Sequence, residues 1–147
     1  MRRAGLGRAR TVLVVDDEPS VLNTVRDGLT GHGYHVLEAL DGETALRIAQ
    51  SHQGPIALLL VDVLMPKLSG REELSGPEVA RRLRADRPDM KVLFMSGFST
   101  EVAVVDGVTS GDPFIVKPFS QDTLARKVRE ILEYRSPFSR PPQSPGR

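Results

Sequence analysis

Residues 11–19 read T-V-L-V-V-D-D-E-P, and this stretch predicts how the fold begins. Its first five residues are apolar or β-branched without alternation, which is typical of a parallel strand buried on both faces. Pro19 then opens a helix in which Val21, Leu22, Val25 and Leu29 recur at helical spacing. A buried strand that passes directly into an amphipathic helix predicts the first half of a β-α-β unit.

The same alternation continues along the rest of the chain. Further strands are expected over residues 34–39, 56–61, 91–95 and 114–116, and further helices over residues 43–50, 76–85, 100–106 and 120–134. Five strands that alternate with five helices predict an α/β fold, with a single doubly wound five-stranded parallel sheet and helices on both faces. Ligands of such sheets bind beyond the carboxyl ends of the strands.

Local signals mark the ends of these helices. Gly31 and Gly33 stop the first helix. Ser75 and Glu78 form an S-x-x-E capping box for the helix that starts near residue 76, and Ser120 caps the last helix. These positions predict where each helix begins or ends without reference to the rest of the fold.

Composition excludes several classes of site. The chain of 147 residues has no cysteine, so disulfides, thiol nucleophiles and cysteine-bound metal centres are excluded. Its three histidines lie in no metal-ligand spacing. The longest aliphatic run, residues 56–61, is far shorter than the roughly 20 residues that span a bilayer. No apolar stretch follows the arginine-rich start, so we expect a cytoplasmic protein without membrane insertion.

Charge is unevenly distributed along the chain. Residues 1–10 contain four arginines and residues 135–147 contain three, with no acid in either segment. Residues 11–134 therefore hold 13 basic and 19 acidic residues, a net charge of −6. We expect residues 1–10 to be a basic disordered tail, residues 11–134 to form one domain, and residues 135–147, with four prolines, to be a Pro-rich tail or linker remnant. We expect no direct binding of nucleic acid.

Polar side chains follow four of the five predicted strands. Asp16 and Asp17 end the first strand, Asp62 the third, Ser96 the fourth and Lys117 the fifth. In a parallel sheet these ends converge, and carboxylates brought together repel one another unless a cation compensates their charge. A small set of oxygen ligands suits Mg²⁺. A lysine and a hydroxyl beside a nucleophilic aspartate can then bind the oxygens of a phosphoryl group.

Four motifs, in this order and at strand ends, resemble the receiver domain of two-component response regulators. They are V-L-V-V-D-D-E-P at 12–19, D-V-L-M-P at 62–66, M-S-G at 95–97 and F-I-V-K-P-F at 114–119. The resemblance covers about residues 10–134 and implies a flavodoxin-like (CheY-like) sheet with the strand order 2-1-3-4-5. The phrase K-V-L-F-M-S-G-F at 91–98 further resembles receivers at the ends of hybrid sensor histidine kinases.

The resemblance implies a role for each residue that matches a motif. Asp62 would accept a phosphoryl group from the phosphohistidine of a histidine kinase or a phosphotransfer protein. Mg²⁺ would be held by Asp16, Asp17, Asp62 and the backbone carbonyl of Leu64. The residues that bind or respond to the phosphoryl group would be Ser96, Lys117 and Phe114, with Gly97 leaving room beside it and Pro118 following a cis peptide bond.

The resemblance also implies how a signal would leave the domain. Phosphorylation would change the face formed by the helix over 100–106, the strand over 114–116 and the last helix, and an output partner of unknown identity would bind there. The domain would assist its own phosphorylation and dephosphorylation and would not be an enzyme acting on other substrates. The sequence leaves open whether the domain forms a homodimer.

Two features depart from the family pattern. Residues 71–76 look like an inserted copy that repeats the Leu-Ser-Gly motif of 68–70, and Leu64 stands where polar residues are frequent. Because the insertion borders the expected site, one alternative stays open: the chain could be a pseudo-receiver, a binding module that works without phosphate. An aspartyl-nucleophile phosphatase fits poorly because it needs a second aspartate at position 64. A nucleotide-binding module also fits poorly because residues 16–18 are acidic where it needs a Gly-rich or hydroxyl-rich loop.

Overall fold

The computed structural model describes residues 9–65, 74–97 and 112–133. The strands are β1 (Thr11–Val15), β2 (His35–Ala39), β3 (Leu58–Asp62), β4 (Lys91–Ser96) and β5 (Phe114–Val116). The helices in the described ranges are α1 (Pro19–Thr30), α2 (Gly42–Ser51), α3 (Gly76–Asp86) and α4 (Gln121–Glu133). All strand pairs are parallel, in the order β2-β1-β3-β4-β5, which confirms the predicted sheet.

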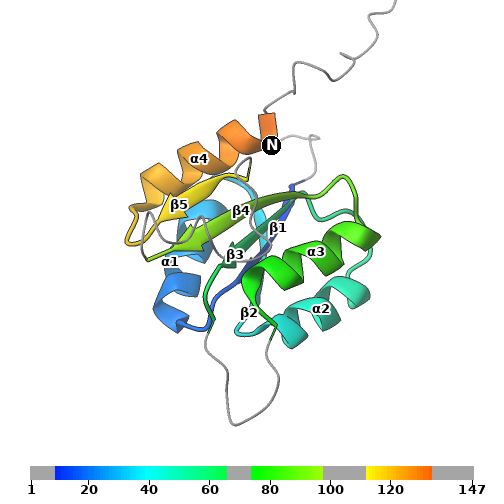
Figure 1. Cartoon of the computed structure of the whole chain (residues 1–147). Helices are drawn as coiled ribbons and strands as arrows, with labels where there is room; N and C mark the ends of the chain where they lie inside the picture. Colours follow the sequence, from blue (N-terminus) through cyan, green and yellow to red (C-terminus); the bar gives the residue numbers. More distant parts are fainter. Residues whose placement is uncertain (1–8, 66–73, 98–111, 134–147) are drawn as a thin grey trace, which may run out of the picture.

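Helices cover both faces of the sheet. Figure 1 shows α1 beside α4 on one face, and α2 beside α3 on the other. Successive residues of β1 point to opposite faces: Val12 and Val14 pack with α1 and α4, whereas Leu13 and Val15 pack with α2 and α3. Both faces are therefore apolar, which explains why the central strands show no alternation of apolar and polar residues.

The predicted serine caps are present, but the capping box of Ser75 and Glu78 is only half formed. The Ser75 hydroxyl accepts the backbone N–H of Glu78 at 3.2 Å, and the Ser120 hydroxyl accepts that of Thr123 at 3.0 Å. The carboxylate of Glu78 binds Arg81 and Arg82 on the same helix instead of turning back to the N–H group of Ser75. None of the helices in the described ranges is long and apolar enough to cross a membrane.

The third strand differs from its predicted range. It was expected over residues 56–61, but β3 begins at Leu58 and ends at Asp62. Pairing with β4 extends to Asp62 and Met95, so the acidic residue belongs to the strand itself. The helix expected over 100–106, residues 66–73 of the loop that contains the repeat, and most of both tails lie outside the described residues.

Candidate functional site

The carboxyl ends of β1, β3, β4 and β5 surround a hollow of about 240 Å³. Several of the predicted site residues line it, namely Asp17, Asp62, Leu64, Ser96, Gly97 and Lys117. A water molecule takes about 30 Å³ of liquid volume. The hollow therefore has room for a small hydrated ion or a phosphoryl-sized group.

Three carboxylates converge beside this hollow: Asp17 and Asp62 line it, and Asp16 lies buried next to them. Oxygens of Asp16, Asp17 and Asp62 lie within 4.8 Å of one another, so these residues can hold a metal ion. Asp16 is fully buried and Asp62 is 5% exposed. Asp16 is further fixed because its Oδ1 accepts the backbone N–H of Glu18 at 2.9 Å. The predicted metal-binding aspartates are thus brought together by the fold.

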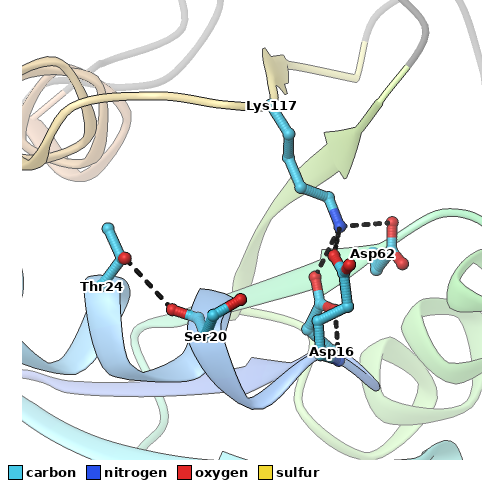
Figure 2. Close-up of polar contacts among 6 residues, drawn as sticks. Asp16, Ser20, Thr24, Asp62 and Lys117 are labelled. Carbon is cyan, nitrogen blue, oxygen red and sulfur yellow. Dashed lines mark hydrogen bonds and ion pairs between the residues drawn. The ribbon is translucent and has the colours of Figure 1, made fainter.

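Lys117 supplies positive charge to the cluster. Its Nζ lies 2.9 Å from Asp16 Oδ2, 3.3 Å from Glu18 Oε1 and 3.6 Å from Asp62 Oδ1. Figure 2 shows the side chain reaching from the end of β5 across to both aspartates. In this structure the shortest of these contacts is with Asp16, and Asp62 lies farther from the ammonium group.

Burial and crowding perturb the titration of these groups. Burial raises the pKa of Asp62 to about 7, with the carboxylate of Asp16 adding to the effect and Lys117 opposing it. Burial also raises the pKa of Asp16, against the hydrogen bonds from Lys117 and Glu18. Burial alone lowers the pKa of Lys117, but Asp16 and Asp62 raise it above its ordinary value. One lysine therefore does not fully compensate the acids, and a cation would find a favourable site here.

The remaining predicted residues lie around the same edge. Ser96 ends β4 and is 3% exposed, whereas the side chain of Leu64 is largely exposed. The Lys117–Pro118 peptide bond is cis, as expected from the sequence. Phe114 is half-buried and packs against Phe94, with ring centroids 5.9 Å apart.

A family model for the response regulator receiver domain matches residues 12–129. The chain belongs to the response regulator receiver domain family of two-component systems. Each of the four receiver motifs contributes at least one residue to the lining of the hollow, so the motifs and the geometry concern the same part of the molecule.

Two of the curated relatives are longer than this chain. The chain is 36% identical over 129 residues to the sensor kinase CckA of Brucella abortus, covering 87% of this chain and 13% of the relative. It is 33% identical over 133 residues to the probable transcriptional regulatory protein TcrX of Mycobacterium tuberculosis, covering 90% of this chain and 53% of the relative. The chain thus spans about half or less of these relatives.

Solved receiver structures have the same architecture. The receiver domain of the hybrid histidine kinase CckA matches with a TM-score of 0.67 and 36% identity, covering 84% of this chain and 99% of that one. A BeF3-activated DrrB receiver domain matches with a TM-score of 0.69 and 26% identity, covering 86% of this chain and all of that one. These similarities agree with the strand order described above.

Sequence reasoning missed two residues of the receiver site. Glu18 was noted as an acid but given no role, although it contacts Lys117. Gly76 was predicted to end the inserted repeat and to start a helix, but not to lie against Asp62, although a Cβ atom at this position would lie 2.1 Å from the backbone oxygen of Asp62. The acidic run D-D-E was a signal for Glu18. The repeated Leu-Ser-Gly motif includes Gly76, but it does not reveal the close approach, because the atom that Gly76 approaches belongs to β3.

Replacing Asp62 by asparagine is expected to raise the free energy of unfolding at pH 8 by about 2 kcal/mol. The amide has a similar shape but places no charge beside Asp16. A carboxyl group whose pKa is raised on folding binds protons more tightly in the folded state, so its presence makes stability fall as pH rises between 3.8 and about 7. The increase in the free energy of unfolding caused by Asp62→Asn should therefore be smaller at pH 5 than at pH 8. Urea unfolding at both pH values checks this, and an equal gain at the two would contradict it.

Proposed function

We propose that this receiver accepts a phosphoryl group on Asp62 from the phosphohistidine of a histidine kinase or a phosphotransfer protein. The observation that carries the proposal is the position of Asp62, which ends a central strand, opens into the hollow and lies beside Asp16 and Lys117. In the transfer, a carboxylate oxygen of Asp62 forms a bond to phosphorus, and the bond from phosphorus to the imidazole nitrogen breaks. The imidazole keeps that electron pair.

The cofactor in this proposal is Mg²⁺. Hard oxygen ligands from Asp16, Asp17 and Asp62 fit this ion, and Leu64, which lines the hollow, would supply its backbone carbonyl as a further ligand. When bound, Mg²⁺ would offset the negative charge of the carboxylates and the phosphoryl oxygens. Compensation of that charge favours the ionised form of Asp62, which is the form that can act as a nucleophile.

Lys117 and Ser96 are proposed to bind the phosphoryl oxygens. Both line the hollow with Asp62, and both carry donors that suit an anion. Phosphorylation adds negative charge and strong acceptors, so these side chains are expected to move toward Asp62. Phe114, on the strand that leads into Lys117, is proposed to respond to this movement.

The proposed output is a phosphorylation-dependent partner, bound at the face to which β5 and α4 contribute. The relatives include a sensor kinase and a transcriptional regulatory protein, so a receiver of this type can be linked to either kind of neighbour. In this proposal the domain assists its own phosphorylation and dephosphorylation and is not an enzyme for other substrates.

Incubation with acetyl phosphate and Mg²⁺, followed by measurement of intact mass, tests the proposal. We expect the mass to increase by one phosphoryl group. The increase should be absent when Mg²⁺ is omitted and when Asp62 is replaced by alanine. An increase that survives Asp62→Ala would place the acceptor elsewhere.

If the mass does not increase, a second probe is needed to show whether the site can bind a phosphoryl group at all. Beryllofluoride binds an aspartate as a phosphoryl mimic without requiring a donor reaction. If neither acetyl phosphate nor beryllofluoride with Mg²⁺ changes the protein, the proposal is wrong and a pseudo-receiver becomes the better description. Deleting residues 71–76 would then show whether the repeated Leu-Ser-Gly segment blocks the hollow.

A further inference from the structure

Glu18 is an acid at the hollow that has no role in the function proposed above. It is the N-cap residue of α1, and its backbone carbonyl accepts the N–H groups of Val21 and Leu22. Side chains at an N-cap commonly accept a hydrogen bond from the first turn of the helix. The carboxylate of Glu18 accepts no hydrogen bond from the first turn of α1, which lies within the described residues. Its Oε1 lies instead 3.3 Å from Lys117 Nζ.

Lys117 has few hydrogen-bond donors for the acids around it. An ammonium group has three N–H donors. Asp16, at 2.9 Å, and Glu18, at 3.3 Å, each accept a hydrogen bond from this group, while Asp62 lies 3.6 Å away. These two bonds leave one donor for Asp62. A phosphoryl group there would bring three strong acceptor oxygens, and it would compete with Asp16 and Glu18 for the other two donors of Lys117.

Glu18 is the weaker of these two competitors. Asp16 is buried and would be costly to leave without a partner, whereas the side chain of Glu18 is 60% exposed and can be solvated when Lys117 moves. Exposed ion pairs contribute little free energy. The contact with Glu18 can therefore bias the position of Lys117 without locking it.

We infer that Glu18 is a positioning residue that holds Lys117 back from the phosphoryl group and so weakens the phosphorylated state relative to the resting state. This inference rests on the proposed function, because it assumes that Lys117 binds a phosphoryl group on Asp62. It adds to that function a residue that sets how readily Lys117 becomes available.

The affinity for beryllofluoride in the presence of Mg²⁺ tests the inference. Replacing Glu18 by glutamine should increase this affinity about threefold, the size expected for loss of an exposed ion pair. Glu18→Asp is the decisive variant because it keeps the charge but shortens the side chain by one methylene group. Aspartate is also a strong N-cap residue, so it should turn toward α1 and away from Lys117.

The two variants separate a contact from a general charge effect. If the contact matters, Glu18→Asp will bind beryllofluoride as tightly as Glu18→Gln. If Glu18→Asp behaves like the wild-type protein, only the negative charge near the hollow matters and the inference is overturned. Glu130→Gln, which removes an exposed acid from α4, is the matched control and should leave the affinity unchanged.

A measurement without Mg²⁺ or beryllofluoride keeps the inference separate from the proposed function. The NMR signal of the Lys117 side chain should shift in Glu18→Gln and in Glu18→Asp, but not in Glu130→Gln. If the wild-type protein binds no beryllofluoride, the proposed function fails and the inference falls with it. If the wild type binds and Glu18→Gln changes neither the Lys117 signal nor the affinity, the inference alone is overturned.

Discussion

Replacing Lys117 by methionine is expected to lower the free energy of unfolding by about 3 kcal/mol at pH 8. Methionine has a similar length but no charge. Asp16 would lose its 2.9 Å contact while remaining fully buried, and Asp62 would lose its neighbouring ammonium group. Removing one partner of a buried ion pair leaves a charge in the interior, which is more costly than removing both partners.

The decrease in the free energy of unfolding caused by Lys117→Met should depend on pH. Burial already raises the pKa values of Asp16 and Asp62, and without Lys117 both should rise further. Folded carboxyl groups with raised pKa values take up protons as the pH falls toward their ordinary value, and this relieves the buried charge. The variant should therefore be less destabilised at pH 5 than at pH 8.

Urea unfolding at the two pH values measures this effect. Lys127→Met on α4 is the matched control and should change stability little, because Lys127 is not among the groups around the hollow. Mg²⁺ added in excess should restore part of the stability of Lys117→Met, since a cation compensates the same carboxylates. Equal destabilisation at pH 5 and pH 8 would show that packing, and not charge, explains the loss.

Replacing Gly76 by alanine is expected to lower the free energy of unfolding by about 3 kcal/mol, or the melting temperature by about 10 °C. The added Cβ would lie 2.1 Å from the backbone oxygen of Asp62 and 3.0 Å from the Cα of Val63. Both are main-chain atoms, one in the last residue of β3 and one in the residue that follows it. Such atoms cannot move aside as a flexible side chain can. The first turn of α3 would have to shift away from the sheet.

The displacement should also disturb the receiver site, because the atom it strikes belongs to Asp62. We expect Gly76→Ala to weaken Mg²⁺ binding in addition to stability. Gly31→Ala is the matched control: Gly31 has the φ of −63° of a right-handed helix, and its Cβ would make an ordinary contact of 3.4 Å with Asp27. This control should be as stable as the wild type or slightly more stable. If thermal unfolding shows the two variants to be equal, the close approach at Gly76 is not a constraint.

Most of the fold could be predicted because its signals are local or periodic. Apolar runs of five or six residues mark strands buried on both faces, and the capping residues Ser75 and Ser120 lie directly before their helices. The boundary of β3 was less predictable. Ile56 and Ala57 are as apolar as the residues that follow, and only pairing with the neighbouring strands decides that β3 begins at Leu58.

From the sequence alone, Asp16, Asp17, Asp62, Ser96 and Lys117 could be placed at the carboxyl ends of predicted strands, and the carboxyl ends of parallel strands lie at one edge of a sheet. That argument is one of topology and needs no side-chain coordinates. It explains why residues up to 101 positions apart could be assigned to one site before their distances were known.

The distances between those residues, and the electrostatic and steric effects that depend on them, follow only from the folded structure. The distances from Lys117 to Asp16, Glu18 and Asp62 depend on the packing of β5 against the sheet. The pKa of Asp62 depends on how deeply it is buried beside Asp16, and the requirement for glycine at position 76 depends on the carbonyl of Asp62 in another element. Electrostatic and steric interactions act between atoms that are close in space, and distance along the chain does not report that closeness.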